Sequence, residues 1–240
     1  MTGTLVFIPA WNEEQNIAAV IQGLHGELPE ADVLVVDDGS TDQTAAVARV
    51  NGAEVLSLDG NQGLRIGIAS GYRWALDHDY AYCGRVDADG QHPAAELARL
   101  LARVYAGECD VAVGSRFVSG EGYEPYRYLP SRTRRVGTAL LRRAMGLVLR
   151  RPFADATSGL YAVNAKALPL LAEPFRTEAP EIEALLRLDD ADLRVEEVPV
   201  EMKARASGDS KLRGRKALKV ITTVIGTLLA ARFVWARRSR

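Results

Sequence analysis

Two aspartates separated by one residue are the clearest sign of chemistry in this sequence. Asp87 and Asp89 stand in the segment Asp87-Ala88-Asp89-Gly90-Gln91, directly after an apolar stretch that is typical of a buried strand. In an extended chain, side chains at this spacing share a face. Carboxylate oxygens suit Mg²⁺ or Mn²⁺, which also binds substrate phosphates, and Gln91 offers a further oxygen. The alternative is that the segment only caps the following helix.

Three other polar clusters also follow apolar stretches. They are Pro9-Ala10-Trp11-Asn12-Glu13-Glu14, Asp37-Asp38-Gly39-Ser40-Thr41-Asp42 and Asn61-Gln62-Gly63. Ligands of open α/β sheets bind at the carboxyl ends of the strands, so we expect all four clusters to meet at one sheet edge. Paired carboxylates at the end of a buried strand are costly unless a cation neutralises them. The clusters therefore predict a site for a charged ligand.

The elements that must position these clusters alternate regularly through residue 115. Apolar runs predict strands at residues 4–8, 32–36, 53–58, 80–86 and 110–114, and helical patterns lie at residues 13–25, 41–50, 64–77 and 93–105. Ser40-Thr41-Asp42-Gln43 has the pattern of a capping box for the second helix. Pro93 is expected at the first position of the fourth. The alternation predicts an α/β fold with a mostly parallel sheet flanked by helices.

The regular alternation ends after residue 115. We predict a loop at 119–130, an arginine-rich helix near 131–150, a strand at 159–164, a helix near 178–190 and a strand at 193–200. A basic loop at 203–214 and a helix near 215–236 close the chain. We expect one domain, residues 1–214, whose first half (1–115) carries the four polar clusters and whose second half is residues 116–214. Residues 215–240 are expected to form a basic amphipathic C-terminal helix.

The formal net charge of −1 conceals an uneven distribution. Residues 127–151 contain eight arginines and no acid, and residues 203–240 contain eleven Lys and Arg against one Asp, so the remainder carries a formal charge of −19. We expect the second half to face something anionic, such as phosphates or a membrane surface. The basic stretches lack interleaved aromatics, so no nucleic-acid partner is expected. The alternative is a solvated helix face.

The compartment and the membrane are predicted from three features. Only two cysteines occur, Cys83 and Cys109, both in apolar runs without metal-ligand spacing, so we expect core residues in a reducing, cytoplasmic setting. No signal peptide is apparent. The uncharged run 220–231 has 12 residues, whereas a bilayer span needs about 20. We expect the basic C-terminal helix to lie on the inner membrane face, the alternatives being a packing or dimer contact.

Together the clusters resemble the family 2 glycosyltransferases with the GT-A fold. The matching pieces are Pro9-x-x-Asn12-Glu13-Glu14, Val35-Val36-Asp37-Asp38-Gly39-Ser40-Thr41-Asp42, Asp87-Ala88-Asp89-Gly90-Gln91-His92-Pro93 and Gly114-Ser115-Arg116. The resemblance implies a UDP-, GDP- or dTDP-linked sugar donor, Mg²⁺ or Mn²⁺ on Asp87, Asp89 and Gln91, and inversion at the anomeric carbon. It also assigns the nucleotide-sugar site to a set of residues: Pro9, Asn12, Glu14, Asp38, Gly63 and Asp87.

The second half resembles the dolichyl- or polyprenyl-phosphate sugar transferases. Asp155-Ala156-Thr157-Ser158-Gly159-Leu160-Tyr161 is similar to their Asp-x-x-Ser-Gly-Phe segment, although Leu160-Tyr161 stands where Phe-Arg is often found. Glu197-Val198-Pro199-Val200, followed by Arg205-x-x-Gly208-x-Ser210-Lys211, is similar to their closing motif. The resemblance implies a catalytic domain with a nucleotide-sugar-binding half (1–115) and an acceptor half (116–214). It also implies a lipid-phosphate acceptor and a diphosphate-binding role for Arg205 and Lys211, which with Asp89 form the expected catalytic set. A serine expected soon after Arg132 is missing, with Val136 near its place.

Two kinds of acceptor remain open at this point. A lipid phosphate is already ionised and needs no general base, and we expect Arg116, Arg132, Arg135 and Ser158 to hold it. A hydroxyl acceptor needs a carboxylate to take its proton, with Glu178, Glu181 and Glu183 as candidates, although we expect at least two of these on a helix surface. The main competing class is a sugar-phosphate nucleotidyltransferase, but residues 9–14 lack the glycines expected after its first strand. An aspartate-dependent phosphatase fits less well, because Asp37-Asp38-Gly39 lacks the Asp-x-Asp spacing.

Overall fold

The computed structural model describes residues 3–120, 122–123 and 153–202. Its strands are β1 (Thr4–Ala10), β2 (Ala31–Asp37), β3 (Glu54–Ser57), β4 (Tyr82–Arg85), β5 (Val111–Ser115), β6 (Tyr161–Asn164) and β7 (Val195–Pro199). Its helices are α1 (Ile17–Glu27), α2 (Thr44–Val50), α3 (Leu64–Asp77), α4 (Ala94–Tyr105), α6 (Leu168–Leu171) and α7 (Pro180–Asp190). The strands form one sheet in the order β3-β2-β1-β4-β6-β5-β7.

The sheet is mostly parallel, as the alternation of strands and helices predicts. β1 pairs in parallel with β2 and β4, β2 pairs in parallel with β3, and β5 pairs in parallel with β7. β6 runs antiparallel to both of its neighbours, β4 and β5. All seven residues of β1 are buried, which explains its continuous apolar sequence, because a central parallel strand is covered on both faces.

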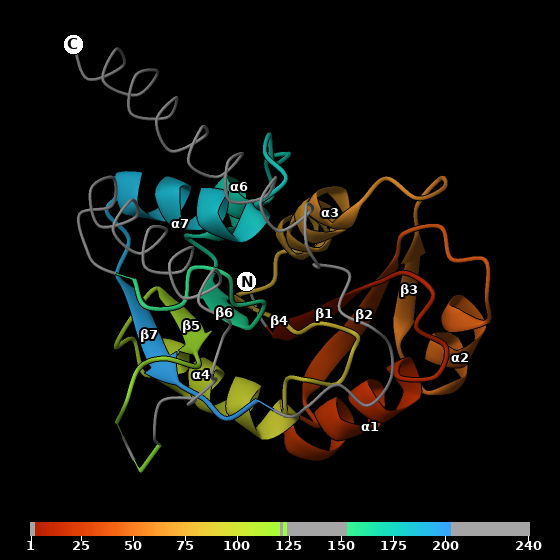
Figure 1. Ribbon diagram of the computed structural model, residues 1–240, viewed down its shortest axis with the longest axis horizontal. Helices are drawn as coiled ribbons and strands as arrows, with labels where there is room; N and C mark the ends of the chain where they lie inside the picture. Colours follow the sequence, from red (N-terminus) through yellow and green to blue (C-terminus); the bar gives the residue numbers. More distant parts are fainter. Residues whose placement is uncertain (1–2, 121, 124–152, 203–240) are drawn as a thin grey trace, which may run out of the picture.

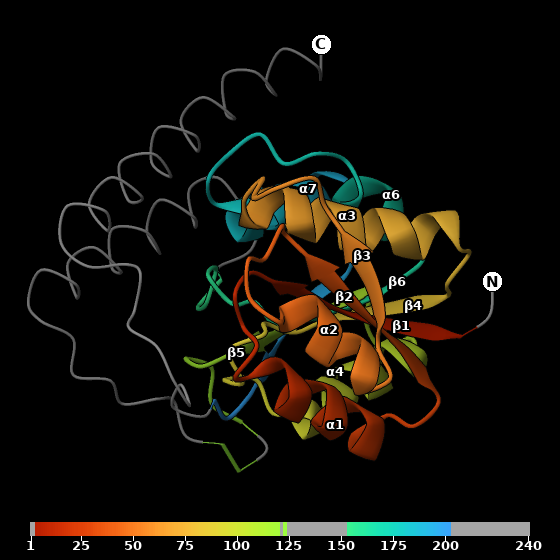
Figure 2. The same ribbon diagram turned by 90° about the vertical axis from the view of Figure 1, so that its right-hand side faces the viewer.

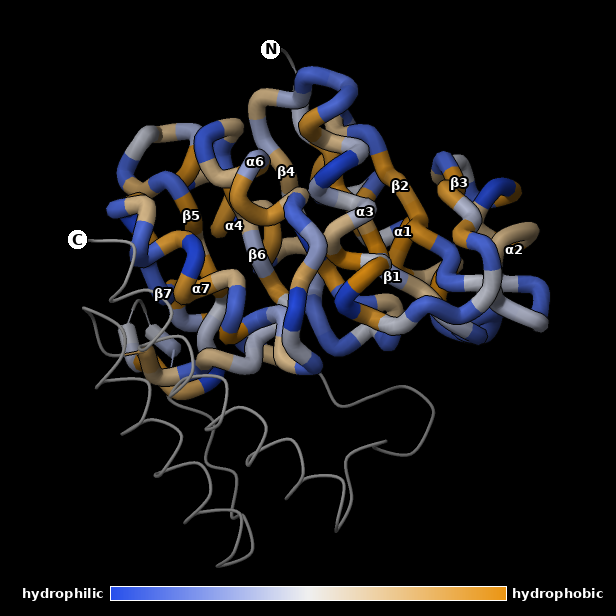
Figure 3. The backbone as a smooth tube through the Cα atoms, turned by 90° about the horizontal axis from the view of Figure 1, so that it is seen from above, coloured by the Kyte–Doolittle hydropathy of each residue, from blue (hydrophilic) through white to orange (hydrophobic). Residues whose placement is uncertain are grey.

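Helices cover both faces of the sheet and enclose two cores. Figure 1 and Figure 2 show α1, α2 and α4 on one face and α3, α6 and α7 on the other. The core under α3, α6 and α7 includes Phe7, Tyr72 and Tyr161, whereas the core under α1 and α4 includes Ile17 and Leu97. Figure 3 shows the hydrophobic stretches along the strands, with hydrophilic residues concentrated in the connecting loops.

Several predicted element boundaries are wrong by a few residues. The second helix begins at Thr44, not at residue 41, and the Ser40 hydroxyl accepts from the Asn12 backbone N–H instead of forming a capping box. The Asp42 carboxylate accepts from the Thr44 N–H at 2.9 Å and so precedes the helix in a local turn. The first helix begins at Ile17 rather than residue 13, and Pro93 precedes α4 instead of opening it.

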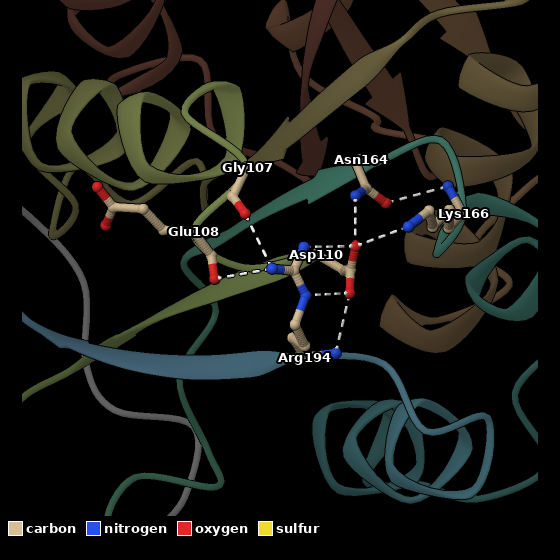
Figure 4. A network of polar contacts seen from close by, with 6 residues as sticks. All are labelled: Gly107, Glu108, Asp110, Asn164, Lys166 and Arg194. Atoms are coloured by element: carbon tan, nitrogen blue, oxygen red, sulfur yellow. Dashed lines mark hydrogen bonds and ion pairs between the residues drawn. The ribbon is translucent and has the colours of Figure 1, made fainter.

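A buried aspartate fastens the starts of β5 and β7 and the end of β6 (Figure 4). The Asp110 carboxylate accepts from the Arg194 side chain at 3.1 and 3.2 Å, from Asn164 Nδ2 at 2.9 Å and from Lys166 Nζ at 3.3 Å. The Arg194 guanidinium holds the pKa of Asp110 well below its usual range, outweighing burial. β5 and β7 are parallel and start here, so this network lies at the opposite sheet end from Ser115.

Two further expectations concern the cysteines and the membrane. Cys83 and Cys109 are both buried free thiols, which confirms their prediction as core residues. Among residues 3–120, 122–123 and 153–202, no helix has both the length and the hydropathy needed to cross a bilayer. The predicted C-terminal helix within 215–240 lies outside the described residues.

Candidate active site

The loops after β1 and β2 are tied to each other by reciprocal hydrogen bonds. Asn12, which adopts a left-handed φ of 54°, accepts from the Thr41 N–H at 2.9 Å and donates its own N–H to Ser40 Oγ at 3.0 Å. The Glu14 carboxylate accepts from the Gln43 N–H at 2.9 Å, directly before α2. Asn12 and Glu14 therefore build the wall in which the resemblance places the nucleotide base. Their direct contact with the base stays a prediction.

Asp38 joins the loop after β2 to the loop before α3. Its two buried carboxylate oxygens accept from the backbone N–H groups of Gln62, at 2.7 Å, and Gly63, at 2.8 Å. The two loops lie so close together that position 39 must be glycine. Its φ is +66°, and a Cβ atom on it would lie 2.4 Å from the Gly60 carbonyl carbon. Each Asp38 oxygen keeps a second lone pair for the predicted ribose or base contact.

Pro9 and Gly63 both lie beside the first part of α3. Pro9 is buried in the last part of β1, and a Cβ atom on Gly67 of α3 would lie 3.6 Å from its Cβ. Gly63 directly precedes α3 and has a φ of +91°, which favours glycine at that position. Three of the predicted polar clusters thus meet at the carboxyl edge of β1 and β2.

The segment that follows β4 turns instead of remaining extended. Residues 88–90 form the turn, and Asp89 Oδ1 accepts from the Gln91 N–H at 3.1 Å. The argument that Asp87 and Asp89 share a face of an extended chain is therefore wrong for this local geometry. The Asp87 N–H donates to Nδ1 of His92 at 3.2 Å, and burial lowers the pKa of this histidine, so a neutral imidazole supports the turn.

The Asp87 carboxylate lies where the two halves of the chain meet. Arg85 Nη2 contacts its Oδ1 at 3.2 Å, and a Cβ atom on Gly159 would lie 2.3 Å from its Oδ2. The Asp87 side chain is nevertheless 36% exposed, so a ligand can reach it. Gly159 belongs to the predicted acceptor half, which means that the segment 155–161 forms one wall of the Asp87 site.

Arg85 is a component of the site that sequence reasoning missed. It is buried near the end of β4, and its Nη2 also contacts Glu181 Oε1 of α7 at 2.9 Å. Burial alone would lower the pKa of Arg85, but Asp87 and Glu181 outweigh it and raise the pKa. The available signal was a charged residue inside an apolar strand, two positions before Asp87 and therefore on the same face.

Arg116, predicted to bind the acceptor, forms a bidentate ion pair with Asp155. Its Nε and Nη2 contact the two Asp155 oxygens at 2.7 Å each, and Nη2 also donates to Thr157 Oγ1 at 3.0 Å. The Glu197 carboxylate accepts from the backbone N–H groups of Ala154 and Asp155, at 2.7 and 2.8 Å. Asp155 is fully buried and Arg116 is 31% exposed, so an acceptor phosphate would share this guanidinium with Asp155.

The other predicted acceptor residues have different outcomes. Ser158 is buried, and its Oγ accepts from the Leu160 N–H at 3.2 Å, which leaves its hydroxyl hydrogen to be donated. Its contact with an acceptor stays a prediction. Arg132, Arg135, Arg205 and Lys211 lie outside the described residues.

The three glutamates considered as general bases are all engaged. Glu178 is 79% exposed and forms an ion pair with Arg65 at 3.7 Å. Glu183 is buried, accepts from the backbone N–H groups of residues 176 and 177, and contacts Arg187 at 2.6 Å. Glu181 binds Arg85. The expectation that at least two of them lie on a helix surface is wrong, because only Glu178 is exposed.

The donor set at Asp87 and Asp89 suits a hard divalent cation. Among the described residues, no group of three or more His, Cys, Asp or Glu side chains is arranged to hold a metal by itself. Two partly exposed carboxylates with the amide of Gln91 nearby fit an ion that takes its other ligands from water and substrate phosphates. Mg²⁺ and Mn²⁺ are such ions.

A mostly parallel sheet with polar loops gathered at its carboxyl edge, and two aspartates after a central strand, defines the GT-A class of glycosyltransferase folds. The comparison with protein families makes this specific. The model of glycosyl transferase family 2 matches residues 5–168, and the chain belongs to this family. The chain is therefore a family 2 glycosyltransferase.

Two relatives at 31% identity are similar over most of their length. Polyprenol monophosphomannose synthase from Mycolicibacterium smegmatis is 31% identical over 220 residues, covering 88% of this chain and 81% of the relative. Undecaprenyl-phosphate mannosyltransferase from Micrococcus luteus is 31% identical over 237 residues, covering 95% of each. Dolichol-phosphate mannosyltransferase from Pyrococcus furiosus is 28% identical over 221 residues, but only 59% of that longer relative is covered.

Solved structures confirm the fold. Glucosyl-3-phosphoglycerate synthase from Mycobacterium tuberculosis, in complex with phosphoglyceric acid, matches with a TM-score of 0.66 and 25% identity, covering 95% of this chain and 79% of that one. The same enzyme in complex with Mn²⁺, UDP-glucose and phosphoglyceric acid matches with a TM-score of 0.67 and 24% identity, with the same coverage.

Proposed function

We propose that this enzyme transfers a sugar from a nucleotide-sugar donor to a polyprenyl phosphate, with inversion at the anomeric carbon. The observation that carries the proposal is the close approach of Gly159 to the Asp87 carboxylate, which leaves no room for a Cβ atom on Gly159. This close approach joins the candidate donor-diphosphate site to segment 155–161, which resembles the acceptor segment of polyprenyl-phosphate sugar transferases. The names of the two relatives at 31% identity support the same acceptor class.

We assign the acidic residues of the site to the cation and to the nucleotide loop, and the basic residues to the donor diphosphate. Asp87 and Asp89, with Gln91, would hold Mg²⁺ or Mn²⁺, which neutralises charge on the leaving nucleoside diphosphate when bound. Asp38 fixes the loop of Gln62 and Gly63 beside the expected nucleotide. Arg205 and Lys211, as the resemblance implies, would place positive charge on the same diphosphate.

A phosphate acceptor also fits the state of the acidic side chains. The phosphate oxygen is already ionised, so the reaction needs no proton acceptor, whereas a hydroxyl acceptor requires an available carboxylate. Glu181 and Glu183 are bound to arginines, and Glu178 pairs with Arg65. Arg116, Arg132 and Arg135, with the Ser158 hydroxyl, would hold the acceptor phosphate. Each arginine would donate a charge-assisted hydrogen bond to that phosphate.

A lipid acceptor implies that the enzyme works at a membrane surface. We propose a single catalytic domain of residues 1–214 whose basic C-terminal helix, 215–240, lies against the inner face of the cell membrane. The reacting phosphate of a polyprenyl lipid stands at that surface, so a peripheral enzyme reaches it without spanning the bilayer.

The direct test is a product assay with undecaprenyl phosphate and single UDP-, GDP- and dTDP-linked sugars, each with Mn²⁺ and with Mg²⁺. Mannose is the first sugar to try, because both relatives at 31% identity are named for it. We expect one donor to give a lipid-phosphate-linked sugar. Phosphoglyceric acid is the second acceptor to supply, since a structural neighbour binds it. A product only with a hydroxyl acceptor, or only from a sugar phosphate and a nucleoside triphosphate, would refute the proposal.

The same assay tests the metal-binding aspartate. We expect Asp89→Asn to slow transfer at least about a hundredfold, because the amide removes a negative ligand from the cation that stabilises the leaving group. Asp190→Asn is the matched control, since Asp190 is exposed at the end of α7, and it should transfer at the normal rate. Turnover of Asp89→Asn near that of the unmodified enzyme would exclude Asp89 as a ligand.

A further inference from the structure

A charged side chain occupies a core position in the centre of the sheet. Arg85 is 3% exposed, and its strand β4 places it between Phe7 of β1 and Tyr161 of β6, on the face covered by α3 and α7. Its Nε is buried, without a hydrogen-bond partner among the described residues. Burying a guanidinium is costly unless carboxylates compensate it, so the position calls for a specific reason.

One nitrogen of Arg85 serves two carboxylates. Nη2 contacts Glu181 Oε1 at 2.9 Å and Asp87 Oδ1 at 3.2 Å. The closer partner, Glu181, lies 96 residues further along the chain, in the first turn of α7, and is itself mostly buried. Asp87 is the more exposed and the more distant of the two partners. A cation that draws Asp87 toward itself would therefore leave Arg85 paired with Glu181.

The charges of this group match a divalent ion. Asp87, Asp89 and Glu181 are negative and Arg85 is positive, so together they carry two negative charges. Arg116, whose charge acts on His92, is paired with the fully buried Asp155. Without Glu181, the buried arginine would cancel one of the two aspartates. Glu181 thus restores the charge that Arg85 removes from the site.

We propose that Arg85 and Glu181 are positioning residues that set the cation affinity of Asp87. Arg85 pairs with Asp87 while no cation is bound, and Glu181 would neutralise the Arg85 charge once Asp87 binds the cation, so the pair acts through charge. This inference rests on the proposed function, because it takes Asp87 and Asp89 to be the metal ligands. It also explains why α7, an element of the acceptor half, contacts the donor half at this point.

The test is Mn²⁺ affinity, measured by the paramagnetic resonance of free Mn²⁺ with the full chain, both alone and with UDP. We expect Glu181→Gln to raise the Mn²⁺ Kd at least about tenfold, because it leaves one net negative charge at the site. The double variant Arg85→Met with Glu181→Gln carries two negative charges again. Its Kd should return to within about threefold of the unmodified protein, a direction that a purely structural role would not produce.

Glu183→Gln is the matched control. Glu183 stands on the same helix, two residues from Glu181, and is also paired with an arginine, but that arginine is Arg187, which does not contact Asp87. Its Mn²⁺ Kd should be unchanged in the folded fraction. If the double variant does not fold, Arg85→Lys combined with Glu181→Gln should remain as weak as Glu181→Gln, because the positive charge persists.

The outcomes separate the inference from the proposed function. An unchanged Kd in Glu181→Gln, or a double variant that binds Mn²⁺ more weakly than Glu181→Gln, would overturn the role of the pair while leaving the metal site intact. If the unmodified protein binds no Mn²⁺ with or without UDP, the metal part of the proposed function fails and the inference fails with it. If the unmodified protein binds Mn²⁺ but forms no lipid-linked sugar, the proposed polyprenyl-phosphate acceptor is wrong and the inference on Arg85 and Glu181 is unaffected.

Discussion

The position of the Asp87 carboxylate requires a glycine at residue 159. Gly159 has an ordinary φ, yet a Cβ atom on it would lie 2.3 Å from Asp87 Oδ2 and 2.7 Å from the carboxyl carbon. The neighbouring atoms belong to a carboxylate that is also held by Arg85. Asp87 would have to leave this position before any larger residue could be accommodated.

We therefore expect Gly159→Ala to lower kcat/KM at least about tenfold and to weaken Mn²⁺ binding, since displacing a ligand by about 1 Å has such effects. The measurements are transfer kinetics and Mn²⁺ titration. Gly26→Ala is the control, because a Cβ atom on this glycine of α1 meets no atom within 4 Å. It should leave both quantities unchanged. Equal behaviour of the two variants would show that Gly159 is not needed for the Asp87 geometry.

At the residue scale the sequence predicts the candidate site residues better than it predicts their surroundings. Asp38, Asp87 and Asp89 are recognisable because carboxylates follow apolar runs, and segments of this kind collect at one sheet edge. The partners of Asp87 are not recognisable in the same way. Glu181 lies 96 residues from Arg85, and no local spacing relates the two. Their pairing follows only from the docking of α7 over the sheet.

At the scale of elements, the strand order shows which features are local and which are not. Alternating apolar and helical segments predict β1 to β5 because each parallel strand buries a short continuous apolar run. The apolar pattern does not predict that β6 lies antiparallel between β4 and β5. That position depends on contacts between residues 161–164 and strands far away in the sequence. The helix starts were misplaced for a related reason, since Asn12 and Glu14 bind the residues before α2 from another loop.

We expect the sheet end at Asp110 to contribute to stability and the opposite end to contribute to transfer, and a substitution of Asp110 tests this expectation. Its network fastens β5, β6 and β7 at the end opposite the candidate site (Figure 4). We expect Asp110→Asn to lower the free energy of unfolding by about 2 kcal/mol, because it removes the charge of a buried carboxylate that accepts hydrogen bonds from the half-exposed Arg194. The folded fraction should retain normal transfer kinetics. Urea unfolding and kinetics on the same sample measure both, and slower turnover per folded molecule would contradict this expectation.

The loss of unfolding free energy caused by Asp110→Asn should depend on pH in a direction that the Asp110 pKa predicts. The Arg194 guanidinium depresses the Asp110 pKa in the folded state, whereas the unfolded chain keeps a pKa of about 3.9. As the pH falls through that value the unfolded state takes up the proton first, so the stabilisation is present above about pH 4 and is lost below it. The difference in unfolding free energy between the unmodified protein and the Asp110→Asn variant should be constant between about pH 6 and pH 5 and should shrink as the pH is lowered from about 4 to about 3. A difference that stays constant over the lower range as well would exclude an electrostatic origin.

At the scale of the whole molecule, charge is separated along the chain. Residues 127–151 and 203–240 are strongly basic, and the rest carries a formal charge of −19. An anionic membrane repels the acidic part and attracts the basic segments, so the enzyme should approach a bilayer in one orientation. The basic segment 127–151 lies in the predicted acceptor half, residues 116–214, and the basic segment 203–240 begins in that half. The orientation that brings them to the surface would also present the acceptor side to a lipid phosphate.

This argument predicts binding that depends on salt. We expect the full chain to co-sediment with vesicles containing about one-third phosphatidylglycerol in about 25 mM salt, and to dissociate largely at about 0.5 M, where the Debye length is only a few ångströms. Replacing Arg237, Arg238 and Arg240 with glutamine should weaken the binding by roughly tenfold or more, since each basic residue contributes about 1 kcal/mol near such a surface. Vesicles of phosphatidylcholine alone are the control and should bind little. Failure to bind at low salt would favour a packing or dimer role for residues 220–231. Equal binding to both vesicle types would show that apolar insertion, rather than charge, brings this enzyme to the membrane.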